Sequence, residues 1–301
     1  MSAPQLLGAH VHDLGGGFVV RRLLPAAQRQ AVGPFLFFDH FGPVTVTPAD
    51  NHDVRPHPHI GLATLTYLFE GVIMHRDNLG YSQRTEPGAI NWMTAGSGIV
   101  HSERKPEAER NSTYVNHGLQ LWLALPQDQQ EVPASFVHTP ASAIPEVQDG
   151  CAQVRVLVGQ AQGAQSPVQP CSPTLYLDVA LPANGHWTLP MLAEEQAVYG
   201  VQGALALDGQ PLAPHTLAVL SESTVLQAGP EGARLAVVGG QPLGRRLMWW
   251  NFVGTSKARI EQAAQAWDTG DGSQGMAQVP GETERIPLPE RRQVSANRAD
   301  F

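Results

Sequence analysis

The chain has few of the features that mark membrane and secreted proteins. Among its 301 residues, no apolar run approaches the roughly 18 residues that span a bilayer. Its first residues also lack a basic segment followed by an apolar one, so we expect neither a signal peptide nor a membrane span. Only two cysteines occur, Cys151 and Cys171. Few cysteines are typical of proteins in a reducing compartment, and we therefore expect a cytoplasmic protein with reduced, buried thiols.

Charge is also scarce. Charged residues make up 15% of the chain, the formal net charge is −8, and there is no long basic run. Because binding to a phosphate backbone requires concentrated positive charge, we expect no direct contact with nucleic acid. The hydrophobic content of 42% predicts a globular protein. The 30 glycines and 25 prolines favour many turns and few long helices, which predicts an all-β fold.

The segment between residues 55 and 103 carries the strongest functional signal. His57 and His59 are two residues apart, and so are His101 and Glu103. Side chains at positions i and i+2 of a strand point to the same face, so two facing strands would bring three imidazoles and one carboxylate to one point. These donors suit iron, manganese, nickel, copper or zinc. The segment has no cysteine with which to build a closed structural zinc site.

An ordinary structural role is the alternative for any single histidine pair on a strand. The second pair, and the glycine-rich turn that precedes it at residues 94–98, favour the metal site instead.

The residues that follow the first histidine pair predict the strands next to it. An alternating apolar run over residues 62–69 indicates a strand, and the Glu70-Gly71 turn predicts a hairpin to a second strand over residues 72–77. If the pleat continues from His59 without a bulge, the odd positions of the first strand share the face of the histidines. These are Ala63, Leu65, Tyr67 and Phe69.

Two other strands contribute histidines. Asp39 and His40 are neighbours in an apolar stretch and would face opposite ways in a strand. His117 precedes the apolar strand over residues 118–126, and we expect it in a loop.

A polar connector rich in proline, over residues 127–149, separates two strand-rich halves. We place the domain boundary between residues 130 and 131, and halves of similar length indicate a duplicated unit. The second half has no pair of histidines two residues apart, so we expect the metal in residues 1–130 only. One helix is predicted over residues 255–268, with Thr255 or Ser256 as its N-cap.

Several stretches resemble the pirin family of the cupin superfamily, particularly its bacterial members. They are residues 35–43 (FLFFDHFGP), 55–61 (RPHPHIG), 91–103 (NWMTAGSGIVHSE) and 118–122 (GLQLW), together with residues 251–253 before the helix. The resemblance implies a bicupin of two packed jelly-roll β-barrels with a C-terminal helix. The N-terminal cupin barrel (1–130) would bind the metal, and the C-terminal barrel (131–301) would not.

The same resemblance implies the metal ligands His57, His59, His101 and Glu103. Other cupins carry a glutamate soon after the first histidine pair, and here Glu103 takes that role instead. One divalent transition metal is implied, with iron expected first and nickel, manganese, copper or zinc as alternatives.

Two functions are associated with this family. The first is a quercetin 2,3-dioxygenase-like reaction, in which Glu103 acts as the base, a flavonol-like aromatic compound and O2 are the substrates, and Trp92, Phe37 or Phe38 hold the flat ring. The second is non-enzymatic regulation, in which the iron protein binds a transcription or metabolic partner protein. Family likeness alone does not choose between them.

Overall fold

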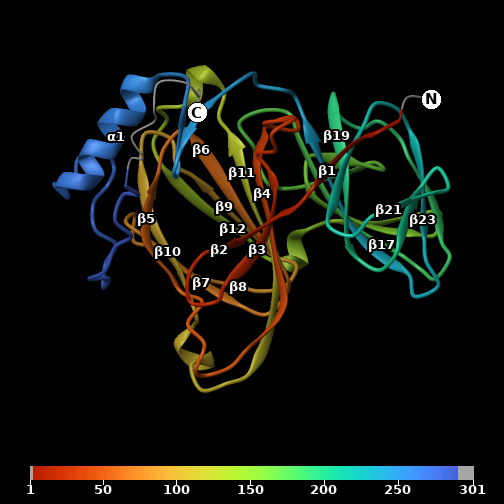
Figure 1. Ribbon diagram of the computed structural model, residues 1–301, viewed down its shortest axis with the longest axis horizontal. Helices are drawn as coiled ribbons and strands as arrows, with labels where there is room; N and C mark the ends of the chain where they lie inside the picture. Colours follow the sequence, from red (N-terminus) through yellow and green to blue (C-terminus); the bar gives the residue numbers. More distant parts are fainter. Residues whose placement is uncertain (1–2, 291–301) are drawn as a thin grey trace.

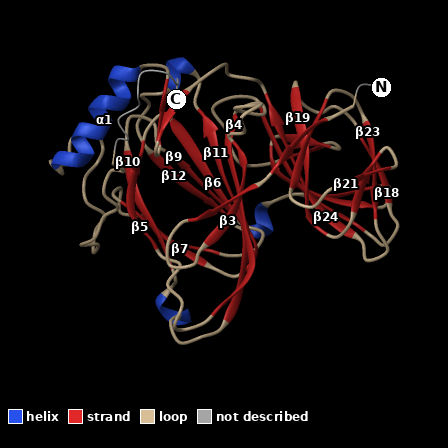
Figure 2. Ribbon diagram, in the orientation of Figure 1, coloured by secondary structure: helices blue, strands red, loops and turns tan. Residues whose placement is uncertain are grey.

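Two β-barrels, each made of two antiparallel sheets, form the described part of the computed structural model, residues 3–290 (Figures 1 and 2). The predicted all-β fold with two barrels and one C-terminal helix is confirmed. Within residues 3–290, no helix has the length and apolar composition to cross a membrane. The expected cytoplasmic location stays a prediction. Cys151 and Cys171 are free thiols, and both are half-buried where we expected buried ones.

The first barrel holds the predicted ligand strands in its smaller sheet. In spatial order, the larger sheet contains β12 (Ser135–Thr139), β9 (Ile90–Thr94), β6 (Leu62–Glu70), β11 (Tyr114–Ala124), β4 (Phe35–Val46), β3 (Val19–Leu24) and β2 (His10–Asp13). The smaller sheet contains β5 (Val54–His59), β10 (Ile99–Arg104), β7 (Ile73–Asp77) and β8 (Ser82–Thr85).

The second barrel repeats this plan. Its larger sheet contains β1 (Gln5–Gly8), β22 (Thr216–Leu220), β19 (Glu195–Gln202), β24 (Ala233–Gly240), β17 (Thr174–Leu181), β14 (Ala152–Val158) and β13 (Glu146–Asp149). Its smaller sheet contains β18 (His186–Leu189), β23 (Thr224–Ala228), β20 (Leu205–Leu207) and β21 (Gln210–Leu212). Aliphatic side chains and Trp187 fill its interior.

Short elements connect these sheets. Two ribbons pair β15 (Gln160–Ala161) with β16 (Ala164–Gln165) and β25 (Leu247–Trp249) with β26 (Phe252–Gly254). Single 3-10 turns occur at Glu107–Glu109, Gln127–Gln129 and Ala141–Ala143.

The predicted helix is α1 (Lys257–Thr269), which begins two residues later and ends one residue later than expected. The Ser256 side chain accepts a hydrogen bond from the Arg259 backbone N–H, so Ser256 is confirmed as the N-cap. Gly270 ends the helix at φ 66°, a left-handed conformation that suits glycine.

The chain ends cross the predicted domain division. The apolar stripe of α1 packs with Ile60 and Val100 of the first barrel, although the helix follows the second barrel in sequence. Conversely, β1 comes first in the chain but pairs with β22 of the second barrel. Figure 1 shows α1 beside β5 and β10, far from the second barrel. The domain boundary that we place between residues 130 and 131 stays a prediction.

Strand β6 faces the opposite way from our expectation. Its odd residues lie in the core cluster that joins the two barrels, where Tyr67 Oη donates to Asp178 Oδ2 at 2.6 Å. Its even side carries Thr66, which donates to the Glu103 carboxylate at 3.3 Å. The reason is Gly61, whose φ of 67° turns the chain between β5 and β6. These strands belong to different sheets, so the alternation does not continue from His59.

The predicted hairpin between β6 and β7 is also wrong. After Gly71, at φ 90°, the chain leaves the larger sheet, and β7 pairs with β10 and β8 of the smaller sheet. This crossing places β7 directly beside the strand that carries His101.

Two histidines form a polar contact inside the interface between the barrels. His117 lies in β11 and is buried, so our expectation of a loop histidine is wrong. Its Nε2 lies 2.8 Å from Nε2 of His40, and His40 Nδ1 lies 2.6 Å from Tyr199 Oη of the second barrel. Burial lowers the pKa of His40 to about 3 and that of His117 to about 4.

Gly61→Ala is expected to destabilise the first barrel. A Cβ there would lie 2.1 Å from the Val253 carbonyl oxygen, where the C-terminal ribbon docks. Gly80→Ala is the matched control, because Gly80 also has a positive φ but has nothing within 4 Å of a Cβ. We expect Gly61→Ala to lower the free energy of unfolding by about 1–3 kcal/mol more than the control, measured by denaturant titration. Equal losses would contradict this account.

The buried His40 contact predicts that the interface between the two barrels loses stability in acid. The folded pKa of about 3 lies below the ordinary value of 6.5, so the unfolded state binds the proton first as pH falls. The stability contributed by neutral His40 is therefore present above pH 6.5 and lost between pH 6.5 and 3. We expect the stability gap between wild type and His40→Gln to narrow over that window. Denaturant titrations at several pH values that give a constant gap would contradict this.

Candidate metal centre

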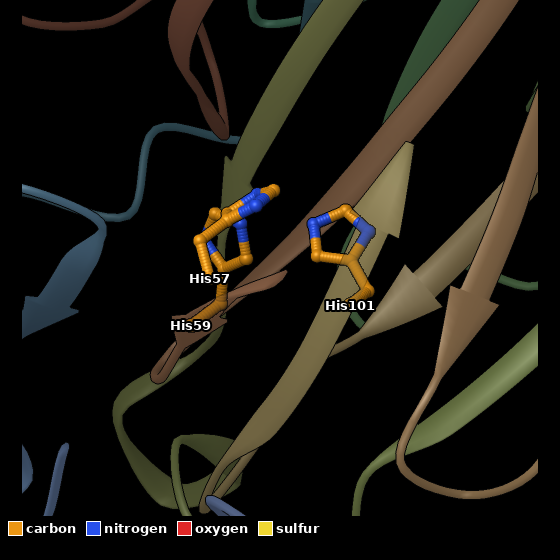
Figure 3. A group of neighbouring side chains, drawn as sticks. All are labelled: His57, His59 and His101. Carbon is orange, nitrogen blue, oxygen red and sulfur yellow. The ribbon is translucent and has the colours of Figure 1, made fainter. Parts of the chain in front are cut away.

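The pairing of β5 with β10 builds the site. His101 lies opposite His57, and Ile99 lies opposite His59, in the antiparallel register. Figure 3 shows the rings of His57 and His59 facing the ring of His101 from the neighbouring strand. One nitrogen of each imidazole lies within 4.8 Å of the others. The structure thus brings the three predicted histidines together, and the relative exposure of each is at most 6%.

Hydrogen bonds fix the proton on two of the rings. His57 Nδ1 lies 2.9 Å from the Arg55 carbonyl oxygen, and His59 Nδ1 lies 3.2 Å from the Asn251 carbonyl oxygen. A carbonyl oxygen only accepts, so each Nδ1 carries the proton. The Nε2 lone pair of each neutral ring is then free to bind a metal.

The two nitrogens of His101 test most directly whether this group of residues fits a metal. Its Nδ1 lies 3.3 Å from His75 Nδ1. Its Nε2 is buried and has no hydrogen-bond partner among the described residues. An unpaired buried nitrogen is uncommon in a native interior and requires an explanation. A cation held by three imidazoles supplies one.

Burial keeps all three rings neutral. It lowers the pKa of His57 to about 4 and holds the pKa values of His59 and His101 well below the usual range. Neutral imidazole is the form that binds metals, so the site needs no deprotonation at neutral pH.

Glu103 lies near the histidines but apart from their compact group. A register shift between His101 and Glu103 interrupts the pairing with β5. The Glu103 side chain lines the same cavity, and Thr66 Oγ1 donates to its Oε1 at 3.3 Å. Burial raises the pKa of this carboxyl group. Its role as a fourth ligand stays a prediction.

The histidines open onto a cavity of about 690 Å³ in the first barrel. Its volume lies in the range of sites for drug-sized ligands, roughly 300–1,000 Å³. Phe37 and Trp122 stack in its wall, with ring centroids 4.0 Å apart and planes 11° apart, and Trp122 meets the edge of His59. Phe37 was expected here, whereas Phe38 and Trp92 lie in the core between the barrels.

A charged pair also lines the cavity. Arg22 and Asp39 form two hydrogen bonds of 2.8 and 2.7 Å, and the guanidinium lies 4.2 Å above the Phe37 ring. Asp39 faces the cavity while His40 faces the second barrel, as their adjacency predicts.

Comparison with known proteins identifies the family. The Pirin family profile matches residues 17–123, and the profile of the Pirin C-terminal cupin domain matches residues 176–272. A pirin-like protein of Caulobacter vibrioides is 41% identical over 281 residues, which cover 91% of this chain and 96% of that protein. The chain belongs to the pirin family.

Other pirin relatives carry more specific names. A Pseudomonas aeruginosa protein named for a proposed quercetin 2,3-dioxygenase activity is 39% identical over 90% of this chain and 85% of its own length. The crystal structure of a quercetin 2,3-dioxygenase from Acinetobacter baumannii superposes with a TM-score of 0.89 at 31% identity, covering 97% of this chain and 96% of that one.

A more distant structure shares the fold. A bacterial pirin from Escherichia coli, in complex with nickel(II), superposes with a TM-score of 0.62 at 16% identity over 79% of this chain and 99% of that one.

Sequence reasoning missed several residues around this pirin site. His75 and Asp77 follow the same i, i+2 spacing as the ligand pairs, and applying the rule to β7 would have found them. Asn251 binds His59 across 192 residues, and no local pattern signals that contact.

Removing one imidazole is expected to abolish metal retention. We expect His101→Ala to lose cobalt(II) or nickel(II) on dialysis, because two imidazoles and a carboxylate hold the ion less tightly. His52→Ala is the control, since His52 lines the same cavity outside the group of three. Metal content measured by mass spectrometry should fall only in His101→Ala. Full retention there would contradict the assignment of His101.

Proposed function

We propose that this pirin is a metal-dependent dioxygenase that cleaves flavonols with O2 in the manner of quercetin 2,3-dioxygenase. The observation that carries the proposal is the convergence of three neutral imidazoles at the wall of an aromatic cavity of about 690 Å³. The similarity to the Acinetobacter baumannii enzyme, over nearly the whole of both chains, supports it.

The residues fit one divalent transition metal, because His101 Nε2 is buried without a partner and the Nδ1 protons of His57 and His59 leave both Nε2 atoms free. We propose His57, His59, His101 and Glu103 as its ligands. Iron is the first candidate, and nickel, manganese, copper and zinc share the same donor preferences. When bound, the metal supplies Lewis acidity toward the flavonol 3-hydroxyl and a centre for dioxygen chemistry.

Glu103 is proposed as the base. Its buried carboxylate lines the cavity beside the histidines, and it takes the proton of the 3-hydroxyl. Thr66 donates a hydrogen bond to Oε1 and so orients the carboxylate. Ring cleavage then consumes O2 and releases carbon monoxide.

The cavity walls hold the substrate. The stacked Phe37 and Trp122 rings offer a flat aromatic surface beside His59. The apolar side chains of Phe18, Val20 and Ile73 line the same space and exclude water from it.

The test combines metal analysis with reconstitution. The protein is loaded anaerobically with each candidate metal, and quercetin turnover is followed together with carbon monoxide release. Turnover that follows metal content supports the dioxygenase. A fully loaded protein without turnover under any metal would overturn it, and the regulator that binds a partner protein would then be the function to pursue.

Glu103→Gln is expected to lower quercetin turnover by about 10²- to 10⁴-fold, since the amide cannot accept the proton. Part of the metal should remain, because the three histidines are intact. Glu70→Gln makes the same change at the exposed end of β6 and should leave kcat unchanged. Turnover of Glu103→Gln at the wild-type rate, measured at equal metal content, would remove Glu103 as the base.

A further inference from the structure

His101 differs from the other two histidines in what holds its Nδ1 proton. His57 and His59 each donate to a backbone carbonyl oxygen, which cannot change its role. His101 Nδ1 instead meets another imidazole nitrogen, Nδ1 of His75, at 3.3 Å. The state of His101 therefore depends on which nitrogen of His75 carries a proton.

The contact with Asp77 determines which nitrogen of His75 carries the proton. Asp77 Oδ2 lies 2.9 Å from His75 Nε2, and both side chains are buried, with relative exposures of 0% for Asp77 and 6% for His75. A carboxylate only accepts, so a neutral His75 carries its single proton on Nε2 and its Nδ1 is a lone pair. That lone pair accepts from His101 Nδ1–H. The remaining His101 nitrogen, Nε2, is then unprotonated and faces its two partners in the site.

The carboxylate is itself held in one orientation. Asp77 Oδ1 accepts from the backbone N–H groups of Leu79 and Tyr81 at 3.0 and 3.1 Å, so Oδ2 is the oxygen left for His75. The His75 ring is also held, because it stacks on Phe136 with centroids 4.3 Å apart and planes 14° apart.

We propose that Asp77 and His75 are positioning residues of the metal centre. They set the tautomer of His101 and so present its Nε2 lone pair to the metal. This inference rests on the metal site of the proposed function, but not on the reaction that the site performs. Outer hydrogen-bond partners of this kind contribute about 10- to 100-fold to metal affinity.

Asp77→Asn gives the sharpest test of the tautomer. The amide oxygen must stay with the Leu79 and Tyr81 N–H groups, so the NH2 group faces His75 Nε2. His75 then carries its proton on Nδ1 and can no longer accept from His101 there. His101 is driven to the tautomer with the proton on Nε2, which blocks the metal-binding nitrogen.

His75→Phe removes the middle residue of the hydrogen-bonded series Asp77, His75 and His101. Phenylalanine keeps the stacking on Phe136 but offers no acceptor to His101 Nδ1. It also disconnects Asp77 from the site. In the double variant, Asp77→Asn should therefore add little to the loss caused by His75→Phe, because two residues in one network are not additive.

The experiment measures cobalt(II) affinity by competition with a chelator in wild type, both single variants and the double variant. We expect each single variant to bind cobalt(II) about 10- to 100-fold more weakly than wild type. The double variant should bind about as weakly as the weaker single variant. The control is Asp13→Asn, which loses a carboxylate that lines the cavity and accepts from a backbone N–H two residues on, as Asp77 does.

A second readout needs no metal. Long-range proton–nitrogen NMR spectra of the metal-free protein should show His101 protonated on Nδ1 in wild type and on Nε2 in Asp77→Asn. Wild-type cobalt(II) affinity in both single variants, additive losses in the double variant, or an unchanged His101 tautomer in Asp77→Asn would each overturn the inference. Should Asp77→Asn fail to fold, the affinity of His75→Phe decides alone.

These results are independent of the reaction. Loss of affinity in the variants together with absent quercetin turnover in wild type would overturn the proposed function and leave the positioning role standing. Turnover in wild type with unchanged affinity in the variants would do the reverse.

Discussion

The hydrogen bond at Nδ1 of each site histidine is the constraint on which the proposed metal centre depends. A neutral imidazole has one proton, and binding a metal through Nε2 requires that proton to be on Nδ1. Each ring meets the requirement with a partner from a different part of the chain: Arg55 nearby, Asn251 from the C-terminal ribbon, and His75 from β7. The fold must bring these three segments together before the site exists.

This requirement gives a reason why the segment after the second barrel packs on the first barrel. Asn251 belongs to the turn between β25 and β26, which follows the second barrel but docks on the first. The parallel bridge between Ile60 and Phe252 seats that turn next to His59. Farther along, Glu282 accepts from Ser102 at 2.8 Å and pairs with Arg104, and so fastens the C-terminal segment to β10.

The second barrel packs against one face of the first barrel's larger sheet. Strand β6 turns Tyr67 toward Asp178 and Thr66 toward Glu103, so a single strand serves the interface and the site. In β4, likewise, His40 faces the second barrel and Asp39 faces the cavity. Large buried side chains on the interface side leave the opposite face free to line a cavity.

The glycine and proline counts predicted the all-β class, and period-two alternation predicted the meeting of His57, His59 and His101. It failed where the chain changes sheets. At Gly61 a positive φ breaks the alternation, so Tyr67 was assigned to the wrong face. After Gly71 the chain crosses to the smaller sheet. Because we predicted a hairpin there, we did not predict that His75 lies beside His101.

Contacts between distant segments could not be predicted from one sequence by these rules. Asn251 and His59 are 192 residues apart, and nothing local to either residue indicates the other. Trp122 is another case, since the sequence marks it as a strand residue but not as part of the cavity wall.

The central claim is that three Nε2 atoms meet at one metal. Anomalous X-ray diffraction from crystals loaded with nickel(II) tests it most directly. We predict one strong peak about 2.1 Å from Nε2 of His57, His59 and His101. A peak elsewhere in the chain, or coordination through Nδ1 of any of the three, would contradict the account.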